Sequence, residues 1–79
     1  MVIKVLGSGC ANCHKLEELA RKAVDELALD AEIVSVTDIK DIMGYGVMST
    51  PALVVDEQVR LSGRVPSYEE VVTILQRMQ

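Results

Sequence analysis

The residues of this sequence with the most chemical potential lie together near its start. Cys10 and Cys13 are its two cysteines, and its single histidine, His14, follows directly after them. Two thiols at this spacing can alternate between dithiol and disulfide, bind a soft metal ion, attach a haem, or form a structural cross-link. The composition of the chain and the elements around the motif must distinguish among these four kinds of chemistry.

The composition limits both the architecture and the partners. Residues 1–79 are enough for one domain, and the 49% hydrophobic content can form a core, which must be aliphatic because the aromatic residues are two tyrosines. The net charge is −4, and no basic surface interleaved with aromatics is apparent, so we expect no nucleic-acid partner. No apolar stretch approaches the roughly 20 residues that cross a bilayer, and residues 1–6 are too short for a signal peptide. We therefore expect a cytoplasmic monomer that does not bind a membrane.

The first half of the chain has the pattern of a strand, a helix and a second strand. Residues 1–6 are apolar except for Lys4, which is typical of a buried strand, and Gly7 ends this run. Residues 11–29 carry apolar side chains at helical spacing, and residues 31–36 are rich in β-branched side chains. The two cysteines therefore lie where the first strand turns into a long helix.

The second half adds a short helix, a hairpin and a final helix. Residues 39–44 predict a short helix, and residues 52–55 and 59–62 predict two strands joined by a polar turn. Ser67 and Glu70 have the spacing of a capping box, which predicts the start of the last helix. The order βαβαββα predicts an α/β fold with a mixed four-stranded sheet covered by helices.

The non-redox alternatives differ in how well they fit this chain. A structural disulfide would close too short a loop to constrain the unfolded chain much, and haem attachment would need an oxidising compartment. A zinc site would need a fourth ligand beyond Cys10, Cys13 and His14. A soft-metal carrier for Cu(I) or zinc stays open, although carrier domains of this size usually end on a strand rather than a helix.

The redox interpretation has a physical argument of its own. Cys10 falls at the start of the long helix, where unpaired N–H groups and the helix dipole favour a thiolate. Cys13 lies one turn further along on the same side, within reach for a disulfide and less exposed. This asymmetry predicts one attacking and one resolving thiol. A non-catalytic redox sensor that uses the same disulfide also stays open.

Three segments resemble the small thioredoxin-like proteins often called redox-active disulfide proteins. These segments are residues 9–13, residues 50–53 (Thr-Pro-Ala-Leu) and residues 63–67. The resemblance implies a cis proline facing the disulfide and electron transport by dithiol–disulfide exchange with protein substrates. It makes Cys10 the nucleophile and Cys13 the resolving residue, with no metal and no cofactor beyond their disulfide. A glutaredoxin-type glutathione motif is missing after the hairpin, which favours a reductase protein as electron donor.

The resemblance also implies a substrate-binding surface around Thr50 and Pro51. A cis proline has no N–H and would turn the Thr50 backbone outward, where an extended substrate segment can pair with it. Tyr45 stands between two glycines, and it is either a solvent-facing loop residue or a lip of the substrate groove.

Two further residues are candidates for modulating the thiols. Ordinary thioredoxins have a buried acid six residues before the first cysteine, where this chain has Lys4. If the Lys4 face of the first strand lies under the first helix, the ammonium sits beneath Cys13 and favours a thiolate, and otherwise Lys4 extends to solvent. His14 is four residues after Cys10 and can reach the same side of the helix.

Overall fold

The computed structural model describes residues 1–7, 11–47 and 49–77. The elements of these residues follow one another as β1 (Val2–Leu6), α1 (Ala11–Glu26), β2 (Glu32–Val36), α2 (Ile39–Gly44), β3 (Ala52–Val55), β4 (Gln58–Ser62) and α3 (Tyr68–Arg77). The predicted order is confirmed. α1 ends three residues earlier than predicted, because the backbone takes a left-handed conformation at Ala28 (φ 52°).

The four strands form one mixed sheet in the order β2-β1-β3-β4. β1 runs parallel to β2 on one side and antiparallel to β3 on the other, and β3 and β4 form an antiparallel hairpin. In this register Val5 of β1 lies between Ser35 of β2 and Leu53 of β3. The strand that leads into the cysteine motif is therefore held on both sides.

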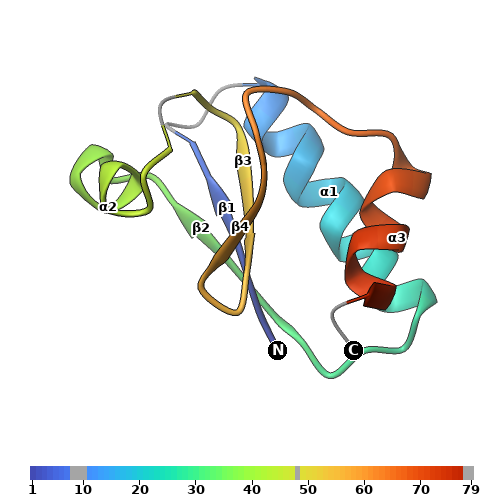
Figure 1. The fold of residues 1–79 in the computed structure, drawn as a ribbon. Coiled ribbons are helices and arrows are strands. Elements are labelled where there is room, and N and C mark those ends of the chain that lie inside the picture. Colours follow the sequence, from blue (N-terminus) through green and yellow to red (C-terminus); the bar gives the residue numbers. More distant parts are fainter. Residues whose placement is uncertain (8–10, 48, 78–79) are drawn as a thin grey trace.

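Two helices cover one face of the sheet and one covers the other. α1 and α3 lie side by side on one face, and α2 lies on the opposite face, near the carboxyl ends of β1 and β2 (Figure 1). In the described part of the chain, no helix is long and apolar enough to cross a membrane.

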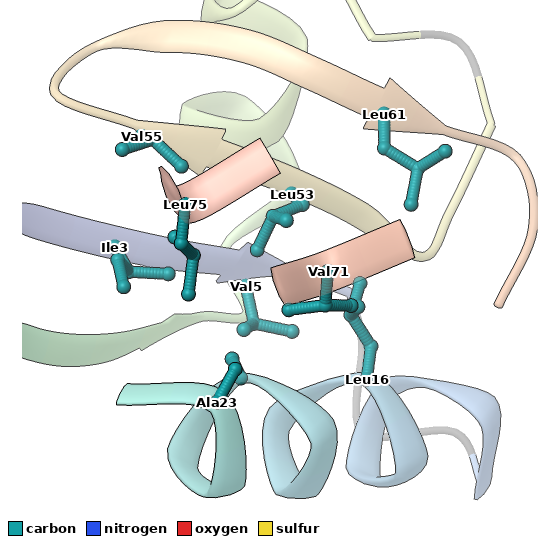
Figure 2. Packing of buried hydrophobic residues seen from close by; sticks show 10 residues of the cluster. Ile3, Val5, Leu16, Ala23, Leu53, Val55, Leu61, Val71 and Leu75 are labelled. Carbon is teal, nitrogen blue, oxygen red and sulfur yellow. The ribbon is translucent and has the colours of Figure 1, made fainter. Parts of the chain in front are cut away.

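The main core lies between the sheet and the pair α1 and α3. Figure 2 shows Leu16 of α1 and Val71 of α3 meeting side chains of the sheet such as Val5. The fully buried members of this core are aliphatic, as the composition requires. Full burial of a side chain of this size contributes about 1.5–3 kcal/mol, so these contacts help to fix α1 over the sheet.

A smaller cluster packs α2 against the other face. Leu6 of β1 and Val54 of β3 meet Ile42 of α2 and Val47 there. Because side chains alternate along a strand, Lys4 lies on the same face as Leu6, while Ile3 and Val5 lie on the α1 face. The Lys4 ammonium, the one charged side chain of β1, is therefore on the α2 side of the sheet.

α3 begins as its sequence predicts, with one change in its cap. The hydroxyl of Ser67 accepts a hydrogen bond from the backbone N–H of Glu70 at 3.2 Å. In a complete capping box the Glu70 carboxylate would return to Ser67, but here it accepts two hydrogen bonds from the Arg64 guanidinium. The connection after β4 is thereby tied to the first turn of α3.

Candidate active site

The site is centred on Cys13, which packs directly on the end of β1. Cys13 is in the first turn of α1, its side chain is 6% exposed, and its sulfur is disulfide-bonded. A Cβ added at Gly7 would lie 2.1 Å from Sγ of Cys13 and 3.0 Å from its Cβ. Glycine is therefore the only residue at position 7 that leaves room for this sulfur. Cys10 lies outside the described residues, so its role as nucleophile stays a prediction.

Pro51 belongs to the same end of the sheet. Leu6 lies opposite Ala52 in the antiparallel pair of β1 and β3, and one further step of this register places Gly7 beside Pro51. The Thr50–Pro51 peptide bond is cis, which is the geometry that the resemblance implies. Pro51 is buried and Thr50 is exposed. Their part in substrate binding stays a prediction, and their place beside Gly7 and Cys13 fits it.

A hollow of about 140 Å³ lies next to Cys13, between α1 and the ends of β1 and β2. His14 and Glu17 of α1 line it together with Ser35 of β2. His14 is exposed on the first turn of α1, and its predicted influence on the thiols stays a prediction.

Glu17 has a more constrained position than the sequence suggested. An i,i+4 pair of Glu17 and Arg21 is typical of the solvent side of a helix, but the Glu17 side chain is only 22% exposed and lines the hollow. Arg21 Nη2 donates to its Oε1 at 3.0 Å. This hydrogen bond holds the pKa of Glu17 below its ordinary value, although partial burial opposes the shift, and the nearby Ser35 hydroxyl favours the charged form as well.

Lys4 does not lie beneath Cys13, because its face of β1 is not the one that α1 covers. Its Nζ donates to Tyr45 Oη at 2.6 Å and to Glu57 Oε1 at 2.5 Å, on the face that carries α2. The Glu57 carboxylate, and after it Tyr45, raise the pKa of Lys4, and the pKa of Glu57 is lowered in return. The reason is the alternation of β1, which points Val5 at α1 and Lys4 away from it.

Tyr45 joins this cluster rather than the cysteine site. Its hydroxyl donates to Glu57 Oε2 at 3.1 Å, and its ring is half-buried against the smaller core. It links the end of α2 to the turn between β3 and β4. The structure thus brings Tyr45 together with Lys4 and not with Cys13, and its substrate-binding role stays a prediction.

Comparison with known proteins agrees with this arrangement. The family model of the thioredoxin domain matches residues 1–76. This chain belongs to the thioredoxin domain family. A thioredoxin of Methanothermobacter thermautotrophicus is 44% identical over 75 residues, which cover 95% of this chain and 97% of that protein. A thioredoxin of Methanocaldococcus jannaschii is 42% identical over 71 residues, covering 90% of this chain and 81% of that protein.

Membership of the thioredoxin domain family confirms the predicted α/β fold and supports a thioredoxin-like redox character. It does not favour the soft-metal carrier that the motif alone left open. Within residues 1–7, 11–47 and 49–77, no three His, Cys, Asp or Glu side chains are grouped so that they could hold a metal ion.

Sequence reasoning missed two residues of the site. Gly7 was interpreted as a strand breaker, yet its N–H continues the sheet by donating to the Val36 carbonyl at 2.9 Å. Its importance is the contact with Cys13, which the sequence does not signal. Glu17 could have been found, because a residue four positions after Cys13 shares its face of a helix.

Proposed function

We propose that this protein exchanges disulfides with other proteins through the Cys10–Cys13 pair. The observation that carries the proposal is the position of Cys13, whose disulfide-bonded sulfur rests on the Gly7 backbone in the first turn of α1. A buried thiol at this point is poorly placed for a first attack on a bulky substrate. We therefore assign the attack to Cys10, which precedes α1, and the resolving step to Cys13.

The exchange moves two electrons from the dithiol to the substrate. The thiolate of Cys10 attacks one sulfur of the substrate disulfide, that bond breaks, and the departing substrate sulfur takes up a proton. Cys13 then loses its proton and its sulfur attacks the Cys10 sulfur of the mixed disulfide. The second substrate thiol is released and the Cys10–Cys13 disulfide remains. This sequence uses no cofactor or metal, and we propose that a reductase protein returns the two electrons.

The substrate would bind along the segment that ends at Pro51. Thr50 is exposed beside the buried proline, and we propose that its backbone pairs with an extended substrate segment as an added strand. The reductase requirement suits a reducing compartment, and we propose the cytoplasm as the place of action.

Insulin-disulfide reduction driven by dithiothreitol tests the proposal. The wild type should accelerate the reaction catalytically, and Cys10→Ser should abolish the acceleration. Cys13→Ser should instead accumulate a mixed disulfide with insulin, visible by mass spectrometry. Lys15→Ser changes an exposed residue of the same helix and should retain wild-type activity.

Two results would overturn the proposal. One is full activity of Cys10→Ser, or trapped adducts with that variant rather than with Cys13→Ser. The other is a protein that does not reduce insulin but retains Cu(I) or Zn²⁺ stoichiometrically against a competing chelator. A slow disulfide couple with no catalysis would instead indicate a redox sensor.

A further inference from the structure

We propose that Glu17 is a positioning residue for the thiol pair: its carboxylate faces Cys13 across a shared hollow and keeps that cysteine a protonated thiol. The inference rests on the proposed exchange, in which Cys10 must ionise before Cys13. No role beyond a surface ion pair would otherwise be expected of a glutamate followed four residues later by an arginine.

The geometry places the two groups together. Cys13 and Glu17 are four residues apart on α1, so their Cβ atoms are about 6 Å apart on one face of the helix. Both line the 140 Å³ hollow, which Ser35 of β2 borders from the other side. The neighbouring Glu18 is exposed and does not line this hollow. Of these two consecutive glutamates, Glu17 therefore lines the hollow beside Cys13 and Glu18 does not.

The carboxylate is held and stays charged. Arg21 binds it at 3.0 Å from one turn further along, and the Ser35 hydroxyl of the sheet also favours its charged form. Arg21 is itself 61% exposed, so solvent screens its positive charge more than it screens the half-buried Glu17. Near neutral pH the hollow that Cys13 lines is therefore also lined by a residue with a negative charge.

Among the described residues that line the hollow, the others do not supply this charge. β1 with the residue after it contributes Val5 and Gly7, and β2 with the residue after it contributes Ser35 and Thr37, all uncharged. On α1 the remaining titratable neighbour is His14, which is exposed. The start of α1 favours thiolates in general, because its unpaired N–H groups face them. Glu17 opposes this effect at Cys13, which is four residues away from it. Cys10 is seven residues away from Glu17 in the sequence.

The consequence is a division of labour between the thiols. A nearby negative charge disfavours a second one, so Glu17 raises the pKa of Cys13. For charges on two side chains whose Cβ atoms are about 6 Å apart, in a partly solvated dielectric, the effect should be on the order of one pK unit. Cys10 then ionises first, and Cys13 stays protonated until the mixed disulfide forms.

Titration of Cys13 in the Cys10→Ser background tests the inference without requiring any catalysis. Ultraviolet thiolate absorbance should show that Glu17→Gln lowers the Cys13 pKa by about one unit. The same change should raise the rate of alkylation by iodoacetamide at pH 7 about threefold, since greater ionisation outweighs the lower nucleophilicity of the thiolate. Glu18→Gln is the matched control, and it should shift the pKa by no more than a few tenths.

Arg21→Gln separates charge from structure. It leaves the carboxylate in place and removes the cation that partly neutralises it, so the Cys13 pKa should rise. A merely structural role of the ion pair predicts the same direction of change for Glu17→Gln and Arg21→Gln. Equal directions, or a Glu17→Gln shift no larger than that of Glu18→Gln, would overturn the inference. Circular dichroism of each variant verifies that the fold is retained. The proposed exchange activity is tested independently by the insulin assay.

Discussion

Replacement of Gly7 by alanine tests the central contact of the site. The new methyl carbon would lie 2.1 Å from Sγ of Cys13 and 3.0 Å from its Cβ. Comfortable contacts between such atoms are about 3.5–4.0 Å, so one partner must move by more than 1 Å. Neither is free to do so, because Gly7 is bonded to β2 and Cys13 is in the first turn of α1, which the core fixes.

Gly7→Ala should lower the free energy of unfolding by a large amount, although it adds one methyl group. Overpacking of a closely packed site typically costs 1–3 kcal/mol, and the contact here is at the severe end, so we expect about 3 kcal/mol. For a domain of this size that corresponds to a decrease in Tm of about 12–24 °C. The protein should still fold, because a typical domain has a stability of about 5–15 kcal/mol.

Urea unfolding under reducing conditions measures this cost without a contribution from the disulfide. A double-mutant cycle with Cys13→Ala then isolates the contact, since that change removes the sulfur that the new methyl group would strike. The cost of Gly7→Ala should be smaller by about 2 kcal/mol in the Cys13→Ala background. Gly44→Ala is the matched control: no atom lies within 4 Å of its added Cβ, and it should be neutral or stabilising by up to about 1 kcal/mol.

The reasoning would be refuted if the effects of Gly7→Ala and Cys13→Ala on the free energy of unfolding were additive. If Gly7→Ala costs the same with and without the sulfur of Cys13, the penalty arises elsewhere in the strand. A Gly7→Ala cost indistinguishable from that of Gly44→Ala would mean that the sulfur does not rest on Gly7 at all.

Three more predictions concern the surroundings of the site. Lys4→Met should leave the Cys thiolate titration unchanged and slightly lower stability in a salt-dependent way, because Lys4 binds Tyr45 and Glu57 on the opposite face; a shifted titration would contradict this. Glu57→Gln should destabilise the protein above the ordinary pKa of 4.5, and the difference from wild type should vanish in urea melts as the pH falls through the lowered pKa of Glu57. Ser67→Ala should cost about 1 kcal/mol in thermal unfolding, since it removes the cap of α3, and an unchanged Tm would show that the cap is dispensable.

The sequence determined much of the architecture. Hydrophobic periodicity, β-branched composition, turn residues and a capping box located the elements from β1 to α3. The pattern failed mainly at the end of α1, where Leu27 and Leu29 continue the apolar spacing beyond Glu26. Local signals of this kind are reliable because hydrophobic spacing and caps act over a few residues. The thiol motif and Thr50–Pro51 were visible for the same reason, as short segments of fixed spacing.

Tertiary structure decided what the residues between these signals do. Alternation grouped Lys4 with Leu6 correctly, but it could not say which helix covers that face, and the answer moved Lys4 from Cys13 to Glu57. The contact of Gly7 with Cys13 depends on how closely α1 approaches β1, a distance set by the whole core. The orientation of Glu17 toward the hollow depends on β2 lying beside β1. A chain specifies local structure residue by residue, whereas contacts between elements exist only after the elements have packed.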